Sequence, residues 1–150
     1  MESKEITPSM DKSKQRLLDE RYLRMARIWA ENSYCVRRQV GALIVRGNAI
    51  ISDGYNGTPS GFENMCEDEY NKTKPYVLHA EANAITKVAK SNNSSLGATL
   101  YVTASPCIEC AKLIIQAGIR RVVYSENYRS EDGVRLLQQA NIEVELISID

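Results

Sequence analysis

The sequence has no long hydrophobic run and no excess of charge of either sign. No segment approaches the ~18 consecutive apolar residues of a membrane span, and residues 1–14 are polar, without the apolar core of a secretory signal. Lysine and arginine total 19, as do aspartate and glutamate, so the chain lacks the basic field on which non-specific nucleic-acid binding depends. These absences predict a cytoplasmic protein with no membrane association, whose partner is a small molecule and not a nucleic acid.

Cysteine and histidine are also scarce, which makes their spacing informative. The chain has four cysteines and one histidine. Cys107 and Cys110 follow Pro106 at the start of an apolar-periodic segment, so on a helix both sulfurs lie on one face. The first turn of a helix favours the thiolate form that binds zinc. His79 opens another such segment and supplies a third ligand, which leaves the fourth position of a tetrahedral zinc site open to water.

Glu81 lies two residues after His79, about 200° around an ideal helix. It is therefore poorly placed to share a metal ion with that histidine. A carboxylate beside a zinc-bound water, whose pKa falls to about 7, can take its proton and deliver it to a substrate. The position predicts that Glu81 is the general base and acid of a hydrolytic reaction.

His79-Ala80-Glu81 and Pro106-Cys107-Ile108-Glu109-Cys110 together form the HxE and PCxxC signature of the zinc-dependent nucleobase deaminases. The chain resembles the cytidine/deoxycytidylate deaminase superfamily, and within it the deoxycytidylate (dCMP) deaminase branch. This resemblance is carried by residues 40–45 (VGALIV), 54–61 (GYNGTPSG), 79–85 (HAEANAI) and 105–119. It implies zinc-dependent hydrolysis of dCMP to dUMP and ammonia, which supplies dUMP for thymidylate synthesis.

Hydrophobic periodicity predicts one α/β domain over residues 15–150, after a flexible tail over residues 1–14. We expect helices over 15–33, 78–90, 107–117 and 131–140, and strands over 40–45, 49–52, 98–103, 121–125 and 142–147. The first two strands should form a hairpin, and the alternation that follows favours parallel crossovers. The expected fold is the three-layer α/β/α cytidine-deaminase-like fold with a five-stranded mixed sheet, as the resemblance also implies.

The resemblance further indicates residues that bind substrate. Asn56, in the Gly-rich loop, would hydrogen-bond the sugar or the base, and the backbone around Ala80 would read the amine and the ring edge. Arg37 and Arg129 rank first as ligands of the 5′-phosphate, although either arginine by itself is more typical of a solvated surface. Tyr128 either closes over the nucleotide or simply packs.

Cys35 and Cys66 have no assigned partner. Some members of the superfamily hold a second, structural zinc with further Cys and His residues, but His79 is the only histidine here. We therefore expect no second zinc site, and we expect Cys35 and Cys66 to be free thiols. A solvated surface is the expected position of the acidic residues Glu63, Glu67, Asp68, Glu69 and Glu109.

The resemblance also implies assembly and regulation. Relatives are commonly homo-oligomers, with a hexamer favoured here, and many are activated by dCTP and inhibited by dTTP together with Mg²⁺. Three alternatives remain. A tRNA adenosine deaminase shares the signature, but the charge balance and the Tyr-Asn-Gly loop argue against it. A free-cytidine deaminase usually has Cys where His79 stands. A non-catalytic zinc module would be expected to have four ligands.

Overall fold

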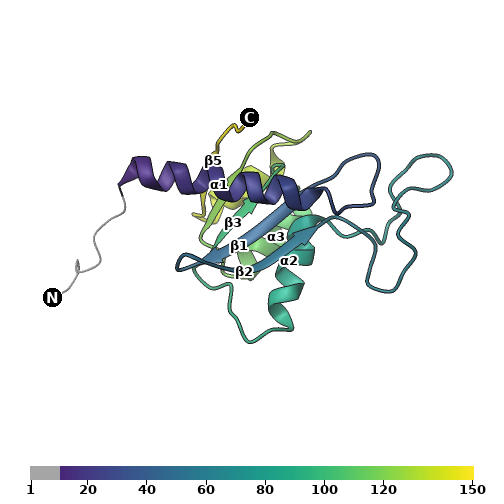
Figure 1. Ribbon diagram of the computed structural model, residues 1–150, viewed down its shortest axis with the longest axis horizontal. Helices are drawn as coiled ribbons and strands as arrows, with labels where there is room; N and C mark the ends of the chain where they lie inside the picture. The colour runs from purple at the N-terminus through teal and green to yellow at the C-terminus, as the bar shows by residue number, and fades with distance from the viewer. Residues whose placement is uncertain (1–10) are drawn as a thin grey trace.

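The computed structural model describes residues 11–150, which form a five-stranded sheet with helices on both faces (Figure 1). The strand order is β2-β1-β3-β4-β5. The elements in chain order are α1 (Lys12–Ala30), β1 (Gly41–Arg46), β2 (Ala49–Tyr55), α2 (Ala80–Ala89), β3 (Thr99–Val102), α3 (Ile108–Gln116), β4 (Arg121–Tyr124), α4 (Asp132–Gln139) and β5 (Glu143–Leu146).

The sheet is mixed, as predicted. β1 pairs with β2 as an antiparallel hairpin and with β3 on its other side, also antiparallel. β3, β4 and β5 run parallel to one another, and α3 and α4 connect them in sequence. The chain therefore switches from a hairpin to crossover connections after β2.

Two apolar cores lie on opposite faces of the sheet. Alternate residues of β1 point to opposite faces, so Ala42 and Ile44 pack with α2, α3 and α4, whereas Leu43 and Val45 pack with α1. Figure 1 shows α1 lying alone across its face of the sheet. This arrangement confirms the predicted three-layer α/β/α fold.

Helix α1 begins earlier than the sequence pattern predicted. Asp11 caps it, and its side chain accepts a hydrogen bond of 3.0 Å from the backbone N–H of Ser13. Residues 12–14, predicted as part of a flexible tail, are therefore helical. The rest of that prediction, residues 1–10, lies outside the described part of the chain.

A buried ionic network fixes α1 on the sheet. Asp19 of α1 is 1% exposed and accepts hydrogen bonds from both terminal nitrogens of Arg121, at 2.9 and 2.8 Å, and from Tyr101 at 2.6 Å. Arg121 also pairs with Glu143 and Glu145 of β5. Burial alone would raise the pKa of Asp19, but the hydrogen bonds from Arg121 and Tyr101 outweigh it and lower that pKa.

Cys35 and Cys66 are joined in a disulfide, so the prediction of two free thiols is wrong. The loops that follow α1 and β2 extend together beyond the sheet (Figure 1). They bring the two Cα atoms to 5.1 Å, within the range that a disulfide requires. The two residues are 31 positions apart in irregular segments, and no periodic pattern relates them.

Among residues 11–150, no helix combines the length and the apolar character needed to cross a membrane.

Candidate active site

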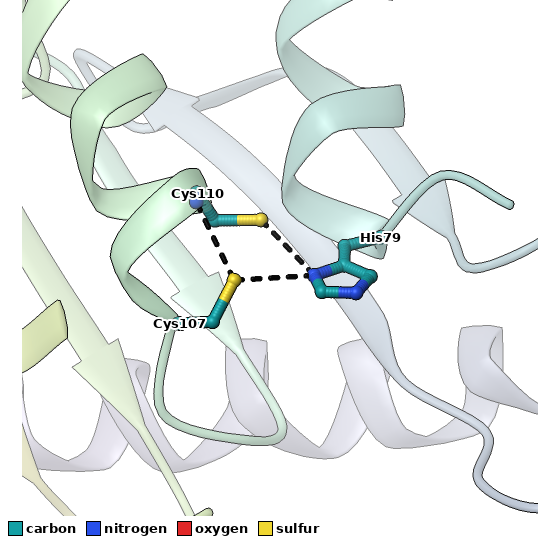
Figure 2. Close-up of side chains that lie close together, drawn as sticks. All are labelled: His79, Cys107 and Cys110. Carbon is teal, nitrogen blue, oxygen red and sulfur yellow. Dashed lines mark hydrogen bonds between the residues drawn. The ribbon is translucent and has the colours of Figure 1, made fainter. Parts of the chain in front are cut away.

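Three potential metal ligands meet where helices α2 and α3 begin (Figure 2). His79 is the N-cap residue of α2, and Cys107 is the N-cap residue of α3. Cys110 lies in the first turn of α3, where its backbone N–H donates to the Cys107 sulfur at 3.5 Å. Nδ1 of His79 lies 3.4 Å from Sγ of Cys107 and 3.3 Å from Sγ of Cys110. The sequence prediction placed Cys107 inside the helix, but it precedes the helix by one residue.

These separations fit a tetrahedral zinc site. Bonds of about 2.0 Å to nitrogen and about 2.3 Å to sulfur at tetrahedral angles place the two ligand atoms about 3.5 Å apart. The observed nitrogen–sulfur distances, 3.3 and 3.4 Å, lie close to that value. The cluster has three ligating residues, which leaves one position of the tetrahedron for water.

The electrostatics of the two sulfurs also suit a cation. The hydrogen bond from Cys110, with a further contribution from His79, lowers the pKa of Cys107 to about 3. The pKa of Cys110 is raised, because its thiol donates to the Cys107 thiolate and is buried. A second thiolate is therefore unfavourable unless a positive ion lies between the sulfurs. A divalent metal would offset this repulsion and release the proton.

Glu81 lies in the first turn of α2 beside the cluster and is 4% exposed. Burial raises its pKa to about 7, although the nearby His79 acts to lower it. A carboxyl group with a pKa near 7 can both accept and donate a proton at neutral pH. Glu109, between the two cysteines, is exposed and pairs with Lys112 at 2.8 Å, as its predicted surface position requires.

Two glycines allow the site helices to pack closely. A Cβ atom at Gly54 of β2 would lie 2.5 Å from the carbonyl oxygen of Ala80, at the start of α2. A Cβ atom at Gly133 of α4 would lie 2.0 Å from the carbonyl oxygen of Pro106 and 2.8 Å from that of Cys107. The absence of side chains at these positions lets β2 and α4 support the ligand-bearing segments directly.

The cluster opens into a cavity of about 220 Å³. His79, Glu81 and Cys107 line this cavity. Every residue predicted from the sequence to bind substrate lines it as well: Arg37, Asn56, Ala80, Tyr128 and Arg129. Cys110, the third potential ligand, does not line the cavity. The structure therefore brings the predicted residues together, although their individual roles stay predictions.

The amide of Asn56 is already engaged with the backbone. Its Oδ1 accepts from the N–H of Val40 at 2.9 Å, and its Nδ2 donates to the carbonyl oxygen of Arg38 at 2.8 Å. The amide oxygen can accept one further hydrogen bond and the amide nitrogen can donate one further hydrogen bond, both available to a substrate. Asn56 thus holds the segment before β1 in place as well as lining the cavity.

Sequence reasoning missed two charged residues of the cavity, Arg38 and Glu67. The Arg38 guanidinium lies 4.8 Å from the centre of the Tyr128 ring, and Arg129 lies 5.5 Å from it. Arg38 also pairs with Glu126 at 3.1 Å. The position of Arg38 next to Arg37 was a signal for it. Glu67 was predicted on a solvated surface but is 7% exposed. That prediction is wrong because its carboxylate accepts hydrogen bonds from the backbone N–H groups of residues 36 and 37, beside the Cys35–Cys66 disulfide.

An open three-ligand metal cluster beside a buried carboxyl group, on a three-layer α/β/α fold, defines a zinc hydrolase of the nucleobase-deaminase class. Comparison with known proteins agrees. The model of the cytidine and deoxycytidylate deaminase zinc-binding region matches residues 17–126, and the chain belongs to this family.

The chain is also similar to individual proteins of this family and to a solved structure. ComE operon protein 2 of Bacillus subtilis is 39% identical over 134 residues, covering 86% of this chain and 70% of that protein. The deoxycytidylate deaminase of Enterobacteria phage T4 is 34% identical over 165 residues, covering 81% and 86%. A crystal structure of the dCMP deaminase of cyanophage S-TIM5, in complex with dCMP and dUMP, superimposes with a TM-score of 0.86 at 44% identity, covering 93% of this chain and 100% of that one.

Proposed function

We propose that this protein is a dCMP deaminase, which hydrolyses dCMP to dUMP and ammonia. The observation that carries the proposal is one cavity lined by His79 and Cys107 of the three-ligand cluster, by the buried Glu81 and by three arginines. The name and ligands of the cyanophage structure support the same substrate.

The proposed chemistry depends on Glu81. A zinc ion held by His79, Cys107 and Cys110 would supply a polarised water whose pKa is near neutral. The Glu81 carboxylate accepts one proton of that water and delivers it to the ring nitrogen beside the amine-bearing carbon. The water oxygen bonds to the amine-bearing ring carbon. Glu81 then takes the remaining proton of that oxygen and passes it to the amine, the carbon–nitrogen bond breaks, and ammonia leaves. The water oxygen stays on the ring as the keto group of dUMP.

The arginines are the proposed ligands of the 5′-phosphate. Neither Arg37 nor Arg129 forms an ion pair with any residue in the range 11–150, and Arg38 is shared with the exposed Glu126. Guanidinium groups donate to phosphate in a fixed fork. Tyr128, with guanidinium groups near its ring, would cover the nucleotide. The backbone at Ala80, buried in the cavity wall, would read the cytosine edge.

Regulation and assembly form a second part of the proposal. We propose a homo-oligomer, with a hexamer favoured, that responds to dCTP and dTTP with Mg²⁺. The family supports this part of the proposal, together with a cytoplasmic location and a role in supplying dUMP. Light scattering tests the assembly, because a stable monomer at micromolar concentration would contradict it. Rates that are indifferent to both triphosphates would contradict the regulation.

The central test is Glu81→Gln. We expect the variant to keep one zinc per chain and to release ammonia from dCMP about 10²–10⁴-fold more slowly. Glu109→Gln is the matched control, because that carboxylate lies between the cysteines but is exposed, and its rate should be unchanged. Wild-type rates on dCMP, cytidine and a tRNA anticodon hairpin separate the related activities. A wild-type protein without turnover, whose Glu81→Gln variant loses zinc, would indicate a structural zinc module instead.

A further inference from the structure

The segment that presents Arg37 and Arg38 to the cavity lies between α1 and β1 and has no regular secondary structure. An irregular segment holds a guanidinium in place only where its backbone is anchored. Two anchors are adjacent in the structure. The disulfide joins Cys35 to Cys66. The residues that follow these two cysteines, Val36 and Glu67, make the second contact.

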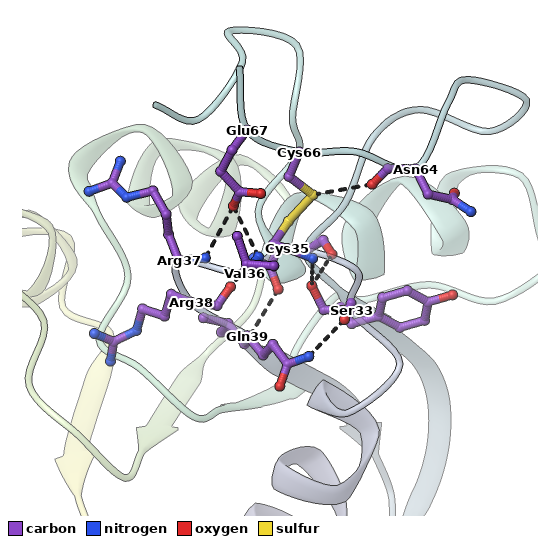
Figure 3. Close-up of a disulfide and its surroundings, with 12 residues drawn as sticks. Ser33, Cys35, Val36, Arg37, Arg38, Gln39, Asn64, Cys66 and Glu67 are labelled. Atoms are coloured by element: carbon purple, nitrogen blue, oxygen red, sulfur yellow. Dashed lines mark hydrogen bonds between the residues drawn. A yellow bond between two sulfur atoms is a disulfide. The ribbon is translucent and has the colours of Figure 1, made fainter. Parts of the chain in front are cut away.

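That second contact is made by Glu67. Its Oε2 accepts hydrogen bonds of 3.1 Å from the backbone N–H groups of both Val36 and Arg37 (Figure 3). Figure 3 shows the side chains of Arg37 and Arg38 extending to the same side of this anchored segment. Glu67 is 7% exposed, so little water competes for these two hydrogen bonds.

The charge of Glu67 requires an explanation of this kind. A carboxylate in a cavity that receives a phosphate repels that phosphate. Its presence in the cavity wall therefore calls for another role. Glu67 forms no ion pair with any residue from 11 to 150, so it does not neutralise the arginines. Within residues 11–150, its carboxylate accepts hydrogen bonds from the two backbone N–H groups.

We propose that Glu67 is a positioning residue for substrate binding, which acts through the backbone of Val36 and Arg37 to aim the neighbouring guanidinium groups at the nucleotide phosphate. This inference depends on the proposed function. It predicts that Glu67 affects the affinity for dCMP and not the chemical step at Glu81.

The test uses Glu67→Ala in the zinc-loaded, full-length enzyme. Loss of this anchor should raise the KM for dCMP and the inhibition constant of dUMP by the same factor, roughly tenfold, with kcat within about twofold of wild type. Glu67→Gln keeps a carbonyl oxygen that can accept both hydrogen bonds, so it should restore KM. Glu69→Ala, two residues away and exposed, is the matched control and should leave both constants unchanged.

Several results would overturn the inference. A loss of kcat at constant KM would mean that Glu67 acts in the chemical step. A Glu67→Gln variant as impaired as Glu67→Ala would mean that the charge matters and not the anchor. Where Glu67→Ala does not fold, Glu67→Asp keeps the charge but shortens the side chain, and an unchanged KM in that variant would refute the proposal. Wild-type turnover of dCMP with no effect of Glu67 removes this inference alone, whereas a wild type inactive on dCMP removes the proposed function with it.

Discussion

Gly133→Ala should weaken zinc binding, although it replaces glycine by a better helix former. Gly133 lies in the first turn of α4, and in an unconstrained helix this change would stabilise the protein by about 1 kcal/mol. Here the new Cβ atom would lie 2.0 Å from the carbonyl oxygen of Pro106, while real Cβ contacts essentially never fall below 3.0 Å. Helix α4 and the Pro106–Cys107 segment must therefore separate by at least 1 Å.

The expected size of the effect follows from the contacts. Overpacking of this kind costs about 1–3 kcal/mol, or roughly 2–12 °C in Tm for a chain of this length. The displaced atoms belong to Cys107 and the residue before it, so the ligand sulfur moves with them. Loss of support behind a metal ligand typically weakens metal affinity about 10–100-fold.

Competition with a chromogenic chelator measures the zinc affinity, and thermal unfolding measures the stability. Gly57→Ala is the control, because a Cβ atom there meets nothing within 4 Å, and its zinc affinity should match the wild type. A Gly133→Ala protein that binds zinc normally and is more stable than wild type would refute the reasoning.

Two further perturbations test contacts elsewhere in the fold. Reduction of the Cys35–Cys66 disulfide, or Cys66→Ser, should lower the free energy of unfolding by about 3–4 kcal/mol. The reason is that the unfolded chain gains the entropy of a loop that the disulfide had closed over a sequence separation of 31. Equal urea midpoints for the oxidised and the reduced protein would contradict this prediction. Asp19→Asn should cost about 3 kcal/mol at pH 7. Because the folded pKa of Asp19 lies below its ordinary value of 3.8, its stabilisation is present above that pH and is lost as pH falls through the folded pKa. The difference between the two proteins should therefore shrink below about pH 4, and a constant difference in urea titrations would count against it.

The metal cluster and the general order of elements could be predicted because both depend on local patterns. The spacing of Cys107 and Cys110 defines one helix face, and His79 and Glu81 stand at the start of another periodic segment. A continuous apolar, β-branched run likewise indicated the strand over 40–45, and apolar alternation indicated the strand over 98–103. The boundaries shifted by a few residues where a side chain outside the pattern, such as Asp11, caps a helix.

The residues around the cavity mouth could not be predicted in the same way. Cys66 and Glu67 lie in an irregular loop about which hydrophobic periodicity says nothing, and their partners are about 30 residues earlier. A grouping with other acidic residues made Glu67 resemble a surface residue. Its burial depends on a contact between two loops, which only the folded chain reveals.

The position of the ligands on two separate helices links metal capture to folding. Cys107 and Cys110 are close in sequence and can meet an ion in a chain that is largely unfolded, but His79 is 28 residues from Cys107, on the far side of β3. Its imidazole reaches the sulfurs only after the crossover between β2 and β3 is complete. A bound ion would then cross-link the starts of α2 and α3, and because all three ligands meet only in the folded chain, metal binding would add to the free energy of unfolding.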